Sequence, residues 1–174
     1  MPYKDSYIYS VRQKIGNDLL IVPSADAIVI DDRGRVLLVM NKDVGQWTTP
    51  GGYAEPNQTS AECAARELLE EAGIQVDAGD LVPFAFMSGY TMTYANGDKL
   101  QPFTQYFFTN TWIDVHSNLD SDEVSDRKWF TIEQMNELNL NPRTSRALKA
   151  LSDYMQTGRY QMIDQSNSTE QLSN

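Results

Sequence analysis

The stretch from Gly52 to Ile74 constrains the fold of this chain more than any other part of the sequence. It opens with a Pro-Gly-Gly turn, and Thr59 followed three residues later by Glu62 is a capping-box pattern. We therefore predict a helix that begins at Thr59 and ends at Gly73, since glycine commonly terminates helices. Small and apolar residues recur at helical spacing and predict the face that packs on a core: Ala61, Ala65, Leu68 and Ala72.

The second half of this helix concentrates acidic side chains. Glu67, Glu70 and Glu71 stand at i, i+3 and i+4, so their carboxylates converge on one side of the helix. Arg66 can pair with Glu70, but like charges at a helix C-terminus are unfavourable. Such a cluster beside a glycine-rich turn suits Mg²⁺, which takes oxygen ligands and bridges to substrate phosphates. The alternative is a solvated acidic face.

The same residues carry a family resemblance. Gly52, Arg66-Glu67-Leu68, Glu70-Glu71 and Gly73-Ile74 resemble the signature of the Nudix (MutT-like) hydrolases, with matching spacing. The resemblance implies that Glu67, Glu70 and Glu71 hold Mg²⁺ or Mn²⁺, with the Gly52 carbonyl as a further ligand.

The resemblance also implies other site residues and shows two departures. Arg66 would orient Glu67, and Gly51 and Gly52 would contact the substrate. Gln58 stands where the family usually has glutamate, so we expect weaker metal affinity. Thr49 stands where family members commonly carry an apolar residue.

Later in the chain, one acid and three aromatic residues are further candidates. Glu123 precedes a Trp-containing strand and resembles the loop acid that serves as a metal ligand or general base in several Nudix branches. A solvated loop acid is the alternative, and His116 in the same loop is expected to be solvated. Tyr90, Tyr94 and Phe103 flank a predicted hairpin at Asn96-Gly97 and are candidates for stacking on a base, although core packing is the commoner role of such residues.

The order of the predicted elements favours an α/β fold, similar to the Nudix α/β/α sandwich with a mixed β-sheet between helices. We expect one domain over residues 1–160 and a polar, disordered tail over residues 161–174. The predicted helices cover residues 5–15, 59–72, 131–138 and 142–157. The predicted strands cover residues 19–22 (closed by Pro23), 25–30, 35–40, 81–87, 91–94, 100–112 and 128–130.

Composition excludes some classes of function. The 174 residues carry a formal net charge of −10, which disfavours nucleic acid as a partner because such binding depends on Lys and Arg. No apolar run is long enough to span a membrane. Cys63, the single cysteine, fits a reducing cytoplasm, and we interpret it as a packing residue. A homodimer is left open.

These observations predict a cytoplasmic, divalent-metal-dependent hydrolase. By resemblance it would cleave the phosphoanhydride of a nucleoside diphosphate linked to another group, as in a nucleoside triphosphate, an ADP-ribose-like compound or a nucleotide sugar. Glu67 or Glu123 would accept a proton from the attacking water. Because of Gln58, the alternative is a weakened Nudix module that binds a nucleotide as a sensor or interaction domain.

Overall fold

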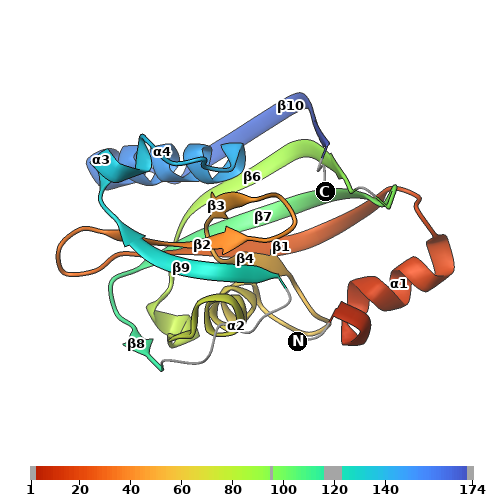
Figure 1. Cartoon of the computed structure of the whole chain (residues 1–174), viewed down its shortest axis with the longest axis horizontal. Helices are drawn as coiled ribbons and strands as arrows, with labels where there is room; N and C mark the ends of the chain where they lie inside the picture. Colours follow the sequence, from red (N-terminus) through yellow and green to blue (C-terminus); the bar gives the residue numbers. More distant parts are fainter. Residues whose placement is uncertain (1–2, 95, 116–122, 172–174) are drawn as a thin grey trace.

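The computed structural model describes residues 3–94, 96–115 and 123–171, and it has a layered α/β architecture (Figure 1). The helical segments are η1 (Tyr3–Asp5), α1 (Tyr7–Ile15), α2 (Ser60–Ala72), η2 (Ala78–Asp80), α3 (Ile132–Met135) and α4 (Pro142–Thr157). The strands are β1 (Leu20–Val29), β2 (Val36–Asn41), β3 (Gln46–Thr48), β4 (Gly51–Tyr53), β5 (Ile74–Gln75), β6 (Val82–Thr93), β7 (Lys99–Thr109), β8 (Ile113–Asp114), β9 (Val124–Phe130) and β10 (Gln161–Gln171). No helix in the described ranges is long and apolar enough to cross a membrane.

The central sheet is mixed, as predicted. Its five strands run in the order β10-β6-β7-β1-β4, and a second, antiparallel sheet has the order β3-β2-β9. Strand β1 pairs in parallel with β7 and antiparallel with β4. Helices α4 and α2 lie on opposite sides of these sheets in Figure 1. The predicted α/β/α sandwich is therefore confirmed.

Strand β1 separates two hydrophobic cores because successive side chains of a strand point to opposite faces. Val22 and Ile28 face the core that includes α4, whereas Ala25, Ala27 and Val29 face the core that includes α2. Ser24 and Asp26 share the alternation of Val22 and Ile28. Two polar side chains of β1 are thus directed to the α4 side of the sheet.

Helix α2 begins and ends as predicted. The Thr59 hydroxyl accepts from the Glu62 backbone N–H, the Glu62 side chain accepts from the Thr59 backbone, and Gly73 ends the helix in the left-handed conformation. The buried face, however, differs from the predicted one: it consists of Cys63, Ala64, Glu67, Leu68, Glu71 and Ala72. Ala61 and Ala65 are only partly buried. Two of the three clustered acids therefore lie on the buried side.

Two strand boundaries predicted from the sequence are wrong. Pro23 does not close a strand but lies inside β1. Proline has no backbone N–H to donate, but its carbonyl still accepts from Ala54 N at 3.1 Å. Residues 82–93 likewise form the single strand β6, which absorbs an irregularity in its pairing with β7 between Met87 and Met92.

The prediction of a disordered tail is wrong for residues 161–171. These residues form β10, which pairs in parallel with β6 at the edge of the sheet. An edge strand is held by backbone hydrogen bonds, so it needs no alternating apolar pattern that a sequence would reveal. Residues 172–174 lie outside the described part of the chain. The assignment of a single domain to residues 1–160 stays a prediction. Strand β10 lies beyond the boundary that was predicted for this domain.

Candidate active site

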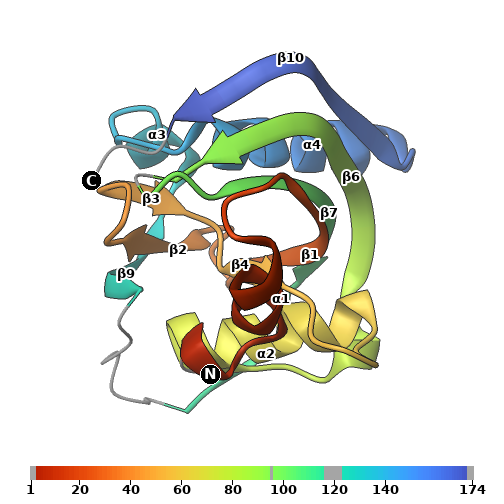
Figure 2. The ribbon, with the colours of Figure 1, turned by 90° about the vertical axis from the view of Figure 1, so that its right-hand side faces the viewer.

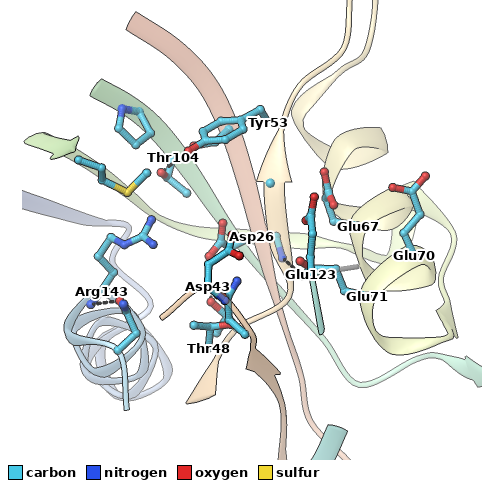
Figure 3. A pocket seen from close by; sticks show the side chains of 18 of the residues that line it. Asp26, Asp43, Thr48, Tyr53, Glu67, Glu70, Glu71, Thr104, Glu123 and Arg143 are labelled. Atoms are coloured by element: carbon cyan, nitrogen blue, oxygen red, sulfur yellow. Dashed lines mark hydrogen bonds between the residues drawn. The ribbon is translucent and has the colours of Figure 1, made fainter. Parts of the chain in front are cut away.

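One cavity of about 570 Å³ brings together residues from both ends of the chain. Figure 3 shows acidic side chains from α2 and Glu123 on one side, with Thr104 and Arg143 on the other and Asp26 between them. The residues that line it are Ser6, Ile8, Ser24, Asp26, Asn41, Asp43, Thr48, Thr49, Gly51, Gly52, Tyr53, Glu55, Arg66, Glu67, Glu70, Glu71, Met92, Tyr94, Pro102, Thr104, Glu123, Asn141, Arg143 and Thr144.

Arg66 organises the acids of α2. Its guanidinium forms ion pairs with Glu67 Oε1 at 2.7 Å and Glu70 Oε2 at 2.9 Å, and it donates to the Tyr53 carbonyl at 2.9 Å. Arg66 therefore connects helix α2 to the segment that follows the Gly-Gly turn. The predicted contact between Arg66 and Glu67 is present, and a charged bond of this kind fixes the direction of a carboxylate.

Positions 51 and 52 require glycine because carboxylates lie close to the Cα atoms of both residues. Gly51 N donates to Glu71 Oε2 at 2.9 Å, and a Cβ at Gly51 would overlap the side chain of Asp26. A Cβ at Gly52 would overlap the carboxylate of Glu67. Neither glycine has a positive φ. Their role is thus to let the backbone approach the acids closely.

Burial makes the charged forms of these acids unfavourable. Glu67 is only 7% exposed and Glu71 only 6%. Desolvation raises the pKa of Glu67 to about 7, although Arg66 opposes the shift. The pKa of Glu71 lies well above its usual range, because of burial and then the charge of Glu67. Partial enclosure and the neighbouring Asp43 raise the pKa of Glu123, which lines the same cavity.

The residues present fit a divalent cation in their chemistry. The donors on this side of the cavity are carboxylate oxygens and the Gly52 carbonyl, which are ligands that Mg²⁺ and Mn²⁺ accept. Gly52 pairs with Ala25 of β1 in the sheet, and Cys63 Sγ, at 3.7 Å, is a further weak donor to the Gly52 carbonyl. Within the described ranges no group of three or more acidic, cysteine or histidine side chains is arranged so that it could hold a metal ion. Glu67 and Glu70 bind Arg66, and Glu71 binds Gly51 N.

Gln58 does not line this cavity. Its Oε1 accepts from the Glu55 backbone N–H at 3.1 Å and closes the turn before α2. The departure from the family signature therefore removes no acid from the cavity wall.

Asp26, which is partly buried in the cavity, and its buried partner Thr49 were not predicted as site residues from the sequence. Thr49 Oγ1 donates to Asp26 Oδ2 at 2.8 Å, and Thr49 N donates to Thr144 Oγ1 at 3.1 Å. Burial raises the pKa of Asp26 to about 6, against the opposing effects of Arg143 and Thr49. A charged residue within the apolar run of residues 25–30 was the available signal for Asp26.

The wall on the side of β6 and β7 carries hydroxyl groups. Tyr53 and Tyr94 share a hydrogen bond of 2.9 Å between their hydroxyls, and Ser24 and Thr104 share one of 2.7 Å. Of the three predicted stacking residues, only Tyr94 lines the cavity. Tyr90 is buried behind this wall, with its hydroxyl 3.3 Å from Thr104 Oγ1.

The structure does not bring Phe103 to the site. Successive side chains of β7 point to opposite faces of the sheet, so Pro102 and Thr104 line the cavity and Phe103 does not. Phe103 is 39% exposed and packs against Phe86. Cys63 is buried and its pKa is raised to about 12, which agrees with a packing role. His116 lies outside the described residues.

Comparisons with known proteins agree with this fold and cavity. A sequence model of the NUDIX domain matches residues 20–151. The nucleoside triphosphatase NudI of Salmonella heidelberg (strain SL476) is 33% identical over 122 residues, which cover 66% of this chain and 84% of that protein. NudI of Enterobacter sp. (strain 638) is 33% identical over 101 residues, or 58% of this chain and 72% of that one. Among solved structures, the MutT NUDIX hydrolase from Burkholderia pseudomallei aligns with a TM-score of 0.63 and 20% identity, covering 76% of this chain and 98% of that one.

The match to the NUDIX domain over residues 20–151 defines the class of protein. This chain belongs to the Nudix family. It is a hydrolase that acts on phosphoanhydride bonds of nucleotide substrates, and the hydrolases of this family generally use divalent metals.

Proposed function

We propose that this protein hydrolyses nucleoside triphosphates to nucleoside monophosphates and pyrophosphate, with Mg²⁺ or Mn²⁺ as cofactor. The observation that carries the proposal is the division of one cavity into an acidic side and a hydroxyl-rich side. The acidic side suits a metal-bound polyphosphate, and the other side, which carries hydroxyls and the Arg143 guanidinium, suits a group with hydrogen-bonding edges. The nucleoside triphosphatases to which the chain is similar support this choice of substrate.

The acidic side repels a bare polyphosphate, since Glu67, Glu70, Glu71 and Glu123 all face it. Glu67, Glu70 and Glu71, with the Gly52 carbonyl, would hold the cation. When bound, the cation neutralises phosphate charge, polarises the phosphorus and lowers the pKa of a coordinated water. Arg66 keeps Glu67 directed at this region through its ion pair.

The remaining chemistry is the transfer of a proton from the attacking water. Glu123 and Glu67 are both candidates for the base, since both line the cavity and have raised pKa values. Both carboxylates stay candidates, and the Glu123→Gln variant distinguishes them, because full activity in that variant would leave Glu67 as the acceptor. The water oxygen bonds to phosphorus, the bridging oxygen leaves with pyrophosphate, and the proton passes to the carboxylate.

The test is a panel of the common ribo- and deoxyribonucleoside triphosphates, ADP-ribose and nucleotide sugars, each with Mg²⁺ or Mn²⁺. We expect nucleoside monophosphate and pyrophosphate in equal amounts from triphosphates. Release of inorganic phosphate alone, or hydrolysis confined to ADP-ribose or nucleotide sugars, would overturn the proposed substrate class. Nucleotide binding without turnover would instead support the alternative of a binding module.

A cytoplasmic location is part of the proposal, because the single cysteine fits a reducing compartment. Size-exclusion chromatography with light scattering distinguishes a monomer from the homodimer that the sequence left open.

A further inference from the structure

Helix α1 completes the cavity although it lies outside the part of the chain that matches the family. The NUDIX match begins at residue 20, whereas α1 spans Tyr7–Ile15. Ser6, the N-cap of this helix, and Ile8 in its first turn both line the cavity that holds the acids of α2. Figure 2 shows α1 in front of β4 and above α2.

The position of α1 is fixed at its C-terminal end by Arg12. This side chain is buried, at 6% exposed, and donates to the carbonyls of Gly16 at 3.0 Å, Asp18 at 2.6 Å and Lys99 at 2.6 Å. It also forms an ion pair with Asp98 at 3.7 Å. A buried guanidinium with several hydrogen bonds holds one geometry, because any displacement leaves polar groups unsatisfied. The hairpin of β6 and β7 and the helix therefore form one rigid wall.

The N-terminal end of α1 is fixed to the catalytic loop by Glu55. Both carboxylate oxygens of Glu55 accept from Tyr7 N, at 3.0 and 3.1 Å. An anion at this position also interacts favourably with the helix dipole. Glu55 itself is positioned by Gln58, whose side chain accepts from Glu55 N. Gln58 thus supports the contact between α1 and the loop that leads to the catalytic helix.

Ile8 lines the cavity and belongs to the core on the α4 side of the sheet, not to the core that packs on α2. It is 6% exposed and belongs to the same core as Val22, Met92 and Leu100. Met92, Tyr94 and Pro102 line the cavity on this side. A substrate with its phosphates at the acids would place its uncharged end here, against apolar side chains.

We infer that α1 sets the specificity for the nucleobase, with Ile8 as the side chain that limits the space for the base and Glu55 as the residue that positions α1. The inference rests on the proposed function, because it assumes a nucleotide substrate. Ile8 acts by size, so shortening its side chain should enlarge the space for the base and favour the larger purines.

The test compares kcat/KM for ATP, GTP, CTP and UTP in wild type, Ile8→Ala, Ile8→Val and Glu55→Ala. Truncation of Ile8 should raise the purine-to-pyrimidine ratio at least about tenfold, since one or a few methylene groups in an apolar pocket discriminate by about 10–200-fold. The change should appear in KM, with kcat nearly constant. Glu55→Ala should shift the ratio in the same direction, and Glu55→Gln, which retains an acceptor oxygen, should restore it in part.

The matched control is Gln13→Ala, an exposed position on the same helix, which should leave the ratio unchanged. Ile8→Val removes a single carbon, so it reports on the same contact with a smaller effect if Ile8→Ala does not fold. Equal changes for all four nucleotides, or changes confined to kcat, would overturn the assignment of specificity to α1. A wild-type protein that hydrolyses none of the four would instead refute the proposed function.

Discussion

Replacement of Glu67 by glutamine should stabilise the metal-free protein at neutral and alkaline pH. Burial raises the pKa of Glu67 from 4.5 to about 7, and this value already includes the ion pair with Arg66. The folded state therefore holds this proton more tightly than the unfolded chain. The stabilisation that comes from this more tightly held proton is fully present below pH 4.5 and is lost as the pH rises to about 7. Above that pH the free energy of unfolding no longer changes with the titration of Glu67.

The difference between a pKa of 4.5 and one of about 7 corresponds to about 3 kcal/mol. Because Glu67 is only 7% exposed, solvent screening removes little of this penalty. Glutamine is isosteric, keeps an acceptor oxygen for Arg66 and carries no charge. At pH 8 we expect the variant to be more stable by about 2–3 kcal/mol, which is a rise in Tm of about 5–10 °C for a protein of this size.

The measurement is urea or thermal unfolding in EDTA from pH 5 to pH 8. The gap between variant and wild type should open across this range and be small at pH 5. Mg²⁺ should raise the Tm of wild type more than that of the variant, since a ligand of the folded state stabilises it by mass action. A variant that is equally stable or less stable at pH 8 would refute the reasoning, because the ion pair with Arg66 would then outweigh the cost of burial.

Glu62→Gln is the control, because the pKa of Glu62 is shifted in the opposite direction to that of Glu67. The pKa of Glu62 is lowered by its hydrogen bonds with the backbone and hydroxyl of Thr59, so its contribution is present at neutral pH and lost in acid. This variant should be less stable than wild type at pH 7 and should approach it as the pH falls below the ordinary range of a carboxyl group. A rise in stability would indicate a general effect of lowering the net negative charge.

Four other variants test the cavity, with Gly79→Ala as a control. Gly52→Ala should reduce turnover strongly, because its Cβ displaces the Glu67 carboxylate at a cost of about 1–3 kcal/mol, whereas Gly79→Ala should remain near wild type in a steady-state assay. Glu71→Gln should lose at least about 100-fold in kcat, and full activity in Glu123→Gln would leave Glu67 as the proton acceptor. Gln58→Glu should leave the Mg²⁺ concentration for half-maximal rate within about twofold of wild type in a metal titration, because residue 58 does not line the cavity.

Local signals in the sequence predicted the catalytic helix well, but not its buried face. The capping box at Thr59 and the stop at Gly73 depend on residues within one turn, so they are visible without tertiary context. The buried face depends on the sheet beneath it. Small residues occur on several sides of this helix, and Glu67 and Glu71 share the packed side with Cys63. Hydrophobic periodicity does not predict buried acids, because burial of a carboxylate is unfavourable unless function requires it.

The residues that sequence reasoning missed are those whose partners lie far away along the chain. Asp26 interrupts an apolar run, and Thr49 occupies a position where an apolar residue was expected; each alone looks like a packing fault. In the structure they form a hydrogen bond with each other, and Thr144 accepts from the backbone of Thr49. The two polar side chains therefore satisfy one another, since a buried polar group is tolerated when it is paired. Arg143, from the same turn of α4 as Thr144, also lines the cavity. Asp26, Thr49 and Arg143 therefore form a polar centre opposite the acids of α2.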